Sequence, residues 1–209
     1  MPSVQWDGPK SADWMLLLAH GAGAGMDSPF MQHMAESIAS QGICVGRFNF
    51  PYMERAVRED KRRPPDSAKK LLAAWEEVIA DAATQMNNKQ RLAIGGKSMG
   101  GRIASMATHL EPIAALVCLG YPFHPPGKPE KLRTEHFSSI KVPAVIIQGE
   151  RDMFGNKEEV RRMQIPRCIK NVWLTDGDHS FKPRKASGLS LEDNLEQAVQ
   201  ALVVFLNSC

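Results

Sequence analysis

Arg91-Leu-Ala-Ile-Gly-Gly-Lys-Ser-Met-Gly-Gly101 runs from a short apolar segment directly into a helical pattern. Arg91–Ile94 is typical of a short strand, and apolar residues recur at helical spacing from Ile103 to Leu110. The glycines between them form Gly-x-Ser-x-Gly around Ser98, a motif that makes a sharp, strained turn between a strand and a helix. The hydroxyl then stands at a helix N-terminus, which favours developing negative charge. The pattern predicts that Ser98 is a nucleophile.

This glycine-rich turn has two other interpretations. A phosphate-binding loop needs G-x-G-x-x-G or G-x-x-x-x-G-K-[ST], and neither is matched, since Lys97 precedes Ser98 without the upstream glycine. A glycine-rich turn without chemistry stays open on the motif alone. The residues that follow the other strands are therefore needed to choose between these interpretations.

Short apolar runs alternate with helical patterns along the rest of the chain. Strands without strict alternation, separated by helices, favour a parallel sheet covered on both faces. We therefore expect one doubly wound α/β domain over residues 1–209, with about six or seven mostly parallel strands. Residues 50–66 and 121–140 are rich in proline or charge and are expected to be loops. The runs expected to be strands are 14–19, 43–48, 91–94, 113–119, 142–147 and 169–174, and the helical patterns lie at 29–42, 68–79, 103–110, 158–163 and 191–206.

An acid and a base follow two later strands, at the sheet edge where such folds place their sites. Asp152 follows the run 142–147, and His179 follows the run 169–174. A serine nucleophile needs a base and an orienting carboxylate, in the chain order serine, acid, histidine. His179 is the only histidine after Asp152. We expect Ser98, Asp152 and His179 to act together, with Glu150 and Asp176 as alternative acids.

The run 14–19 ends in Ala19-His-Gly-Ala-Gly-Ala-Gly25. Small residues after this strand let the backbone approach a bound carbonyl group. We expect the Ala22 N–H, with Gly23 as the alternative, to form an oxyanion hole with the Met99 N–H. His20 is expected to fix this loop more than to take part in chemistry.

Two connections, Phe50–Arg63 and Tyr121–Phe137, are expected to frame the pocket. Neither is long enough for a large lid, so we expect an open site and a small or flexible substrate. The candidate pocket residues are His20, Tyr52, Tyr121, Phe123 and Phe154.

The composition narrows the possible partners. The 209 residues are 43 % hydrophobic and 23 % charged with a net charge of +3, which is too balanced to indicate a nucleic-acid or membrane partner. The four cysteines have no CxxC or CxH clustering, so we expect no metal site and free thiols in a cytoplasmic protein. The N-terminus has no pattern of a secretory signal. Nothing in the sequence indicates an oligomeric state.

Seven segments have distinctive sequences: 19–25, 49–53, 63–66, 95–102, 120–128, 148–152 and 177–179. Together they resemble small α/β-hydrolases of the dienelactone-hydrolase-like kind, and in particular bacterial hydrolases related to testis-expressed and chromatin-complex hydrolase-like proteins of animals. The resemblance implies a single α/β-hydrolase domain, a Ser98–Asp152–His179 triad, no required cofactor and a small-molecule acyl substrate cleaved through an acyl-enzyme. It departs from dienelactone hydrolases proper, which use a cysteine where this chain has Ser98. The alternative is a hydrolase-like binding or scaffold protein with little or no activity.

Overall fold

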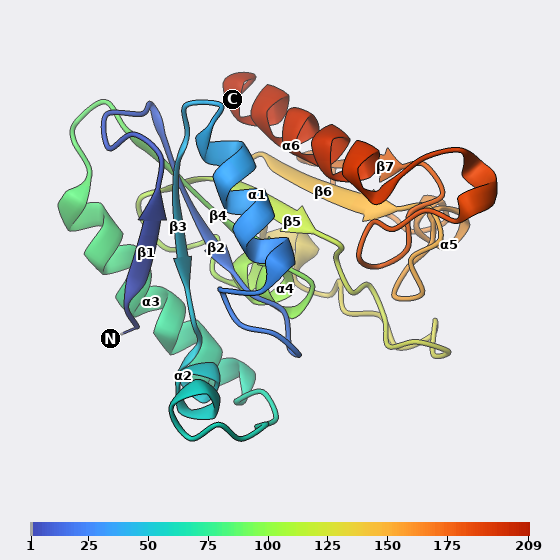
Figure 1. Cartoon of the computed structure of the whole chain (residues 1–209), viewed down its shortest axis with the longest axis horizontal. Helices are drawn as coiled ribbons and strands as arrows, with labels where there is room; N and C mark the ends of the chain where they lie inside the picture. Colours follow the sequence, from blue (N-terminus) through green and yellow to red (C-terminus); the bar gives the residue numbers. More distant parts are fainter. Residues whose placement is uncertain (1) are drawn as a thin grey trace.

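One sheet of seven strands, in the order β1-β3-β2-β4-β5-β6-β7, forms the centre of the computed structural model, which describes residues 2–209. Figure 1 shows the sheet crossing the whole molecule. Strands β2 to β7 pair in parallel, and only β1 runs antiparallel, beside β3. The prediction of a doubly wound, mostly parallel sheet is confirmed. The strands are β1 (Val4–Asp7), β2 (Trp14–Ala19), β3 (Cys44–Phe48), β4 (Arg91–Lys97), β5 (Ile113–Leu119), β6 (Ala144–Gly149) and β7 (Ile169–Leu174).

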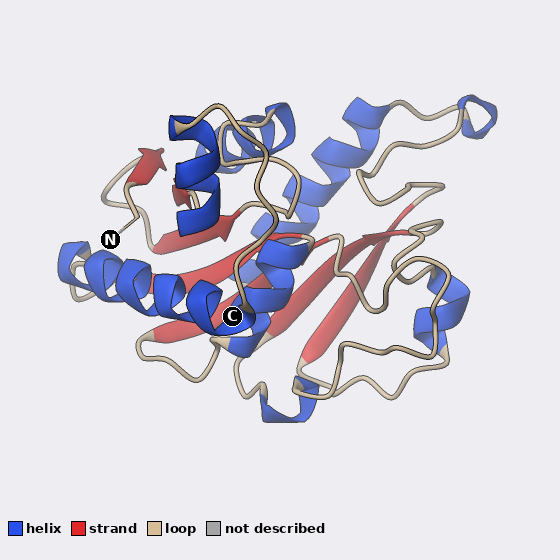
Figure 2. Ribbon diagram, turned by 90° about the horizontal axis from the view of Figure 1, so that it is seen from below, coloured by secondary structure: helices blue, strands red, loops and turns tan. Residues whose placement is uncertain are grey.

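Helices cover both faces of the sheet (Figures 1 and 2). Helices α1 (Pro29–Ala39) and α6 (Leu191–Asn207) lie on one face, and α3 (Ala68–Gln85) and α4 (Met99–Met106) lie on the other. Every residue of β2 is buried, because alternate side chains enter the two layers. Leu16 packs with α1 and α6, whereas the next residue packs with α3 and α4. This two-sided burial explains the continuous apolar runs in the sequence.

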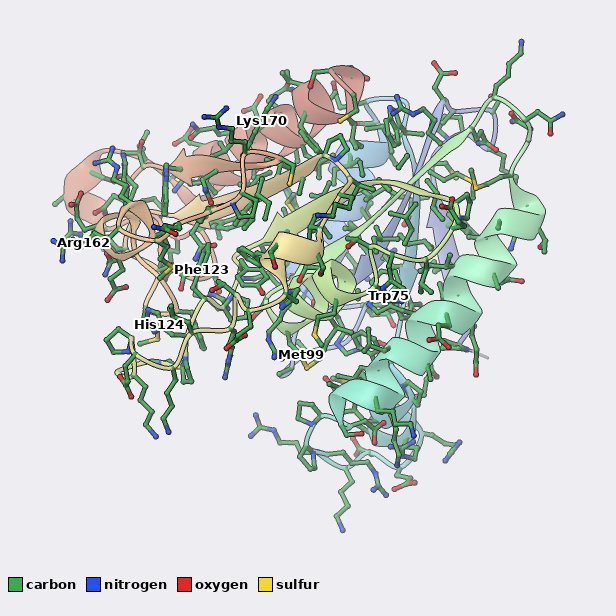
Figure 3. All side chains as sticks on the ribbon, turned by 180° about the vertical axis from the view of Figure 1, so that it is seen from behind. Trp75, Met99, Phe123, His124, Arg162 and Lys170 are labelled. Atoms are coloured by element: carbon green, nitrogen blue, oxygen red, sulfur yellow. The ribbon has the colours of Figure 1, made fainter. Side chains whose placement is uncertain are left out.

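Trp75 anchors α3 against the sheet on the face seen in Figure 3. Its ring is fully buried and meets Phe48 of β3 edge to face, with the ring centroids 4.9 Å apart. Phe48 in turn contacts Phe50 at 5.3 Å. These three aromatic rings extend the hydrophobic core from α3 to the carboxyl end of β3, next to the candidate active site.

The expectation of a loop over residues 50–66 is wrong for its first half, because α2 (Pro51–Arg58) is a helix. Pro51 occupies the first helical turn, where its fixed φ suits the helix and its missing N–H costs nothing. Tyr52 is buried, and Glu54 in the first turn and Arg58 in the last complement the helix dipole. Proline and charge thus start and stabilise a helix here instead of breaking one.

Smaller differences concern the ends of the elements. The antiparallel strand β1 was not predicted; it has only four residues, of which Val4 and Trp6 pack on the core. Strand β4 continues through its glycines to Lys97, and α4 stops at Met106, so Leu110 lies outside it. The expected segment 158–163 is the short α5 (Lys157–Arg161).

The long connection after β5 contains one 3-10 turn, η1 (Phe137–Ser139). A second 3-10 turn, η2 (Lys185–Ser187), lies just before α6. No inserted lid domain occurs between residues 2 and 209. No helix in that range is long and apolar enough to cross a membrane.

The register of the sheet brings the ends of the parallel strands to one edge. Ala19 pairs with Gly96, Lys97 with Leu119, and Gly149 with Leu174. The loops that follow β2, β4, β6 and β7 therefore emerge next to one another, and they carry the residues predicted to form the site.

Candidate active site

Ser98 occupies the turn between β4 and α4 with φ 52° and ψ −116°, a conformation that costs a non-glycine residue energy. Its N–H donates to the Leu119 carbonyl at 2.9 Å, which ties the turn to β5. The flanking glycines are required by close packing. A Cβ at Gly96 would lie 2.3 Å from the Ala19 carbonyl oxygen, and one at Gly100 would lie 2.4 Å from the same atom. The expected strain at Ser98 and close approach of strand and helix are both present.

The structure brings Ser98, His179 and Asp152 together in one hydrogen-bonded chain. Ser98 Oγ lies 2.8 Å from Nε2 of His179, and Nδ1 of His179 lies 2.7 Å from Oδ2 of Asp152. A neutral imidazole satisfies both contacts when Nδ1–H donates to the carboxylate and Nε2 accepts from the serine hydroxyl. The three side chains come from three separate strand ends, as expected.

Asp152 is fully buried, and every contact it makes favours a fixed carboxylate. Its Oδ1 accepts from the Phe154 N–H at 2.8 Å, and its Oδ2 accepts from Nε2 of Gln148 at 2.8 Å as well as from His179. Gln148 also accepts from the Tyr121 N–H at 2.7 Å. Gln148 is not among the residues predicted from the sequence; its only signal there is a polar residue at the end of an apolar strand.

The alternative acids are engaged elsewhere. Lys157 donates to Glu150 and lowers the pKa of that carboxyl group, as the Asp176 N–H also does. Arg184 donates to Asp176 and lowers the pKa of Asp176 to about 2, with a smaller contribution from Arg151. Neither carboxylate contacts His179. Of the three candidate carboxylates, Asp152 is the one that contacts His179.

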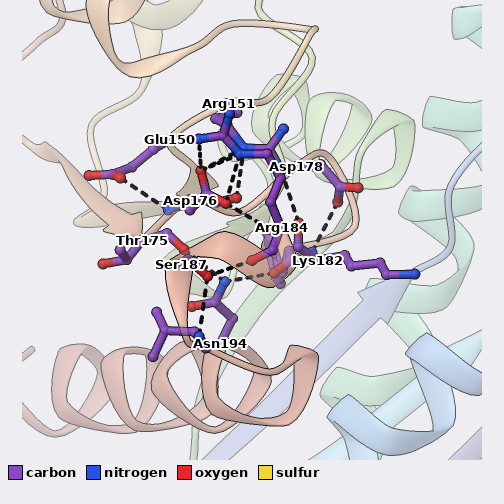
Figure 4. A network of polar contacts seen from close by, with 11 residues as sticks. Glu150, Arg151, Thr175, Asp176, Asp178, Lys182, Arg184, Ser187 and Asn194 are labelled. Carbon is purple, nitrogen blue, oxygen red and sulfur yellow. Dashed lines mark hydrogen bonds and ion pairs between the residues drawn. The ribbon is translucent and has the colours of Figure 1, made fainter.

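Figure 4 shows the polar network that supports the loop of His179. Asp178 Oδ1 accepts from the Ser180 N–H at 2.8 Å and from the Lys182 N–H at 3.0 Å. Asn194, on α6, donates to the carbonyls of Phe181 at 2.7 Å and Thr175 at 3.1 Å. Asp178 thus holds the loop through hydrogen bonds within it, and Asn194 ties the loop to α6. These bonds limit the movement of His179.

The loop after β2 lies beside Ser98. A Cβ at Gly21 would be 3.7 Å from Ser98 Cβ, so the backbone passes close to the hydroxyl. Tyr52 Oη lies 3.1 Å from the Ala22 carbonyl oxygen and 3.3 Å from that of Gly21, and its hydroxyl hydrogen is donated to this pair. The N–H groups of Ala22, Gly23 and Met99 make no hydrogen bond to any residue from 2 to 209. They are free to donate to a ligand.

His20 is fully buried beneath this loop. Its Nδ1 lies 2.6 Å from the Gly21 carbonyl oxygen, and its Nε2 accepts from the Phe50 N–H at 3.1 Å. Burial lowers the pKa of the imidazole, which keeps it neutral and suited to one donated and one accepted bond. His20 therefore fixes the loop, as expected, and it does not face the cavity described next.

A cavity of about 680 Å³ opens beside Ser98 and His179. Gly21, Ala22 and Gly23 form one side of it. The apolar wall comes chiefly from the two helices that cover the front face of the sheet in Figure 1. Its members are Pro29, Phe30 and Met31 of α1, Leu191 and Leu195 of α6, and Phe154.

Most of the expected pocket residues lie elsewhere. Phe154 lines the cavity and its ring lies 4.3 Å from that of His179. Tyr52, Tyr121 and Phe123 are buried and absent from the lining. Tyr121 packs against Phe123 at 5.0 Å and donates to the Arg133 carbonyl. The connection after β5, part of which Figure 3 marks by Phe123 and His124, therefore builds core instead of framing this pocket.

Metal ligation has no candidate within residues 2–209, because no three His, Cys, Asp or Glu side chains gather there in a suitable group. The groups available for chemistry are the hydroxyl, the imidazole, the carboxylate and the free N–H groups.

A family model described as "Alpha/beta hydrolase domain" matches residues 12–207, and the chain belongs to this family. The fold is similar to that of an alpha-beta serine hydrolase homologue from Coxiella burnetii, with 19 % identity, a TM-score of 0.71, and coverage of 95 % of this chain and 90 % of the other. It is also similar to a serine hydrolase without lid from Xanthomonas campestris, with 19 % identity, a TM-score of 0.70, and coverage of 95 % and 86 %.

A dienelactone hydrolase from Anabaena variabilis shares the fold as well, with 21 % identity, a TM-score of 0.65, and coverage of 94 % of this chain and 88 % of the other. The expected α/β-hydrolase fold is confirmed, and a dienelactone hydrolase is among the structures that share it. The relation to the testis-expressed group stays a prediction.

Proposed function

We propose that this protein is a serine hydrolase of the carboxylesterase type that cleaves a small ester or related acyl compound. Ser98 is the nucleophile, His179 the general base, and Asp152 the carboxylate that orients the base. The observation that carries the proposal is the chain of contacts from Ser98 Oγ to His179 Nε2 at 2.8 Å and from His179 Nδ1 to Asp152 Oδ2 at 2.7 Å. Both distances meet the requirement for proton transfer and for holding one tautomer.

In the first half of the reaction, Ser98 Oγ attacks the substrate carbonyl carbon while His179 Nε2 takes the hydroxyl proton. The resulting imidazolium is stabilised by the buried Asp152 carboxylate, which stays ionised. Nε2 then returns the proton to the leaving alcohol or thiol as the tetrahedral intermediate collapses. The products of this step are the free leaving group and an acyl ester on Ser98.

The charge that develops on the carbonyl oxygen needs donors that are already in place. We assign this role to the N–H groups of Met99 and Ala22, with Gly23 as the alternative on the same loop. These groups have no acceptor among residues 2–209, which supports the assignment. Tyr52 contributes indirectly, because its hydroxyl holds the carbonyls of that loop.

In the second half, a water molecule attacks the acyl ester, and His179 Nε2 takes its proton. Collapse of the second tetrahedral intermediate breaks the bond to Ser98 Oγ, which recovers its proton from the imidazolium. The acyl group leaves as a carboxylic acid. The apolar wall of the cavity favours an acyl or alkyl group without charge, and 680 Å³ is within the usual size range for small-molecule sites.

The test is covalent labelling with a fluorophosphonate, which reacts with activated serines. Wild-type protein is expected to be labelled at Ser98, as located by peptide mass spectrometry, and both Ser98→Ala and His179→Ala to abolish labelling. Ser180→Ala is the matched control, since Ser180 lines the same cavity outside the hydrogen-bonded chain and its loss is expected to leave labelling intact. An ester and thioester panel then gives the acyl preference.

Turnover of the best ester is expected to fall about 10⁴-fold or more in Ser98→Ala. Wild-type protein that is folded and yet resists the probe would overturn the proposal. That result would favour a binding or scaffold protein that shares the fold.

A further inference from the structure

Two consecutive residues hold opposite ends of the same histidine. Ser98 contacts the His179 ring at Nε2, and Lys97 donates from Nζ to the backbone carbonyl oxygen of His179. Lys97 is the last residue of β4, so its position is set by the sheet. The strand end that presents the serine therefore also holds the main chain of the histidine loop.

The end of β5 leaves room for this contact. Gly120 has φ 66°, and a Cβ there would lie 2.7 Å from Lys97 Nζ and 3.1 Å from the His179 carbonyl oxygen. The same Cβ would lie 3.5 Å from Cε1 of the imidazole ring. A glycine is thus the residue that lets the ammonium group, the carbonyl and the ring meet at one point.

Both aromatic rings and charged groups surround the ammonium group of Lys97. Its Nζ lies 5.3 Å from the ring centre of Phe30 and 5.4 Å from that of Phe181, within the range of cation–π attraction. The charged groups that act on it are Asp152 and Asp178, which favour the ammonium form. His33 of α1 lines the same cavity.

Burial outweighs those two carboxylates and lowers the pKa of Lys97 to about 8. The lysine is therefore mostly charged at neutral pH and loses its charge as the pH rises through about 8. A charged donor makes a hydrogen bond roughly twice as strong as a neutral one.

We propose that Lys97 is a positioning residue for His179: its ammonium group fixes the His179 carbonyl, and the fixed main chain keeps Nε2 aimed at Ser98. The inference rests on the proposed roles of Ser98 and His179. Asp178 and Asn194 hold the loop on either side of the histidine, but neither of them bonds to the histidine's own main chain. Lys97 completes the support at the residue that has to be aligned.

Two variants separate this role from simple packing. Lys97→Met keeps the length of the side chain and removes donor and charge, whereas Lys97→Arg keeps a donor that stays charged over the whole working pH range. We expect Lys97→Met to lower kcat for a small neutral ester by about 10²-fold at neutral pH with little change in KM, because a misaligned base costs turnover more than binding. Lys97→Arg is expected to retain most of kcat.

The pH profile supplies the readout that packing would not move. In wild type, kcat should fall as the pH rises through about 8. That fall should be absent in Lys97→Arg, which stays charged, and in Lys97→Met, which has no charge to lose. Thermal unfolding of each variant controls for folding, and if Lys97→Met fails to fold, the Lys97→Arg profile alone decides.

A Lys97→Met variant that folds and keeps wild-type kcat would overturn the inference, as would an alkaline fall of the same midpoint in wild type and Lys97→Arg. Fluorophosphonate labelling in the same buffers separates the two proposals. Failure of wild-type protein to be labelled rejects the proposed hydrolase function. If wild type is labelled and Lys97→Met keeps wild-type kcat, only the role of the lysine is rejected.

Discussion

Gln148 donates from Nε2 to Oδ2 of Asp152 at 2.8 Å, so the carboxylate oxygen that receives His179 also receives an amide. The same amide group reaches the Tyr121 and Gly155 carbonyls, both at 3.1 Å, which fixes its orientation. Gln148 itself is fully buried. The Asp152 carboxylate is therefore held by a side chain four residues earlier, near the end of β6.

We expect Gln148→Met, which keeps the size of the side chain, to lower kcat about tenfold or more, because the freed carboxylate can rotate away from His179. The variant also leaves the buried Tyr121 N–H without its acceptor, which costs about 1–3 kcal/mol of unfolding free energy. Steady-state kinetics and denaturant unfolding measure the two effects. A loss of stability with unchanged kcat would mean that Gln148 only packs.

Tyr52 and Tyr121 form a matched pair for testing the loop after β2. Tyr52→Phe removes the hydroxyl that holds the Gly21 and Ala22 carbonyls and keeps the buried ring. We expect kcat to fall up to about tenfold, equivalent to about 1.4 kcal/mol of transition-state stabilisation. Tyr121→Phe removes a bond to the Arg133 carbonyl instead and should leave kcat unchanged at a similar cost in stability. Equal kcat values in the two variants would contradict the role of Tyr52.

Gly100→Ala tests the close packing of α4 on β2. The added Cβ would lie 2.4 Å from the Ala19 carbonyl oxygen and 2.6 Å from that of His20, so the helix has to move. We expect a loss of about 1–3 kcal/mol in unfolding free energy together with a loss of probe labelling at Ser98. Gly23→Ala is the stability control, because a Cβ there meets nothing within 4 Å. Similar stabilities for the two variants would refute the packing argument.

Leu191→Trp tests the apolar cavity as the acyl site. Leu191 is 40 % exposed at the start of α6, so a larger ring fits and extends over the cavity. We expect kcat/KM for long-chain esters to fall about tenfold relative to acetate esters, and Leu191→Ala to change the ratio in the opposite direction. Val204→Trp, on the exposed side of the same helix, is expected to change neither. An unchanged chain-length profile in Leu191→Trp would place the acyl group elsewhere.

Asp176 gives the stability a defined dependence on pH. Arg184 lowers the pKa of Asp176 to about 2, below that of an aspartate in the unfolded chain, about 4. The stability it contributes is therefore present above about pH 4 and is lost as the pH falls through about 2. We expect Asp176→Asn to lower the melting temperature at neutral pH and the gap to wild type to close in acid. Glu76→Gln, at an exposed site on α3, controls for the loss of one negative charge, and a gap independent of pH would contradict the expectation.

The hydrogen-bonded chain could be predicted because Ser98, Asp152 and His179 each lie in the loop or turn that follows a strand. Strand ends are visible as the limits of apolar runs, and the parallel topology brings them to one edge. The cavity wall could not be predicted in the same way. Phe30 and Leu195 lie on amphipathic helices, and their spacing is that of core residues whether or not a cavity adjoins them.

The supporting contacts were hidden for a related reason. Gln148 is four residues from its partner Asp152, and Lys97 bonds to the main chain of a residue 82 positions away. No residue pattern in the sequence records either bond. The helix α2 was missed because Pro51 and the charges after it are as common in loops as at helix ends. Tertiary burial of Tyr52 decides between the two, and the sequence does not carry that information locally.

Asn194 and Leu195 are neighbours on α6, and they serve the two halves of the site separately. Asn194 anchors the histidine loop and Leu195 lines the cavity. A shift of α6 therefore moves both the loop and the cavity wall. Engineering a different chain-length preference through buried α6 positions would therefore tend to disturb the alignment of the base. Met31 lines the same cavity from α1, a helix that makes no hydrogen bond to the histidine loop within residues 2–209, so changes there reshape the cavity without touching the Asn194 anchor.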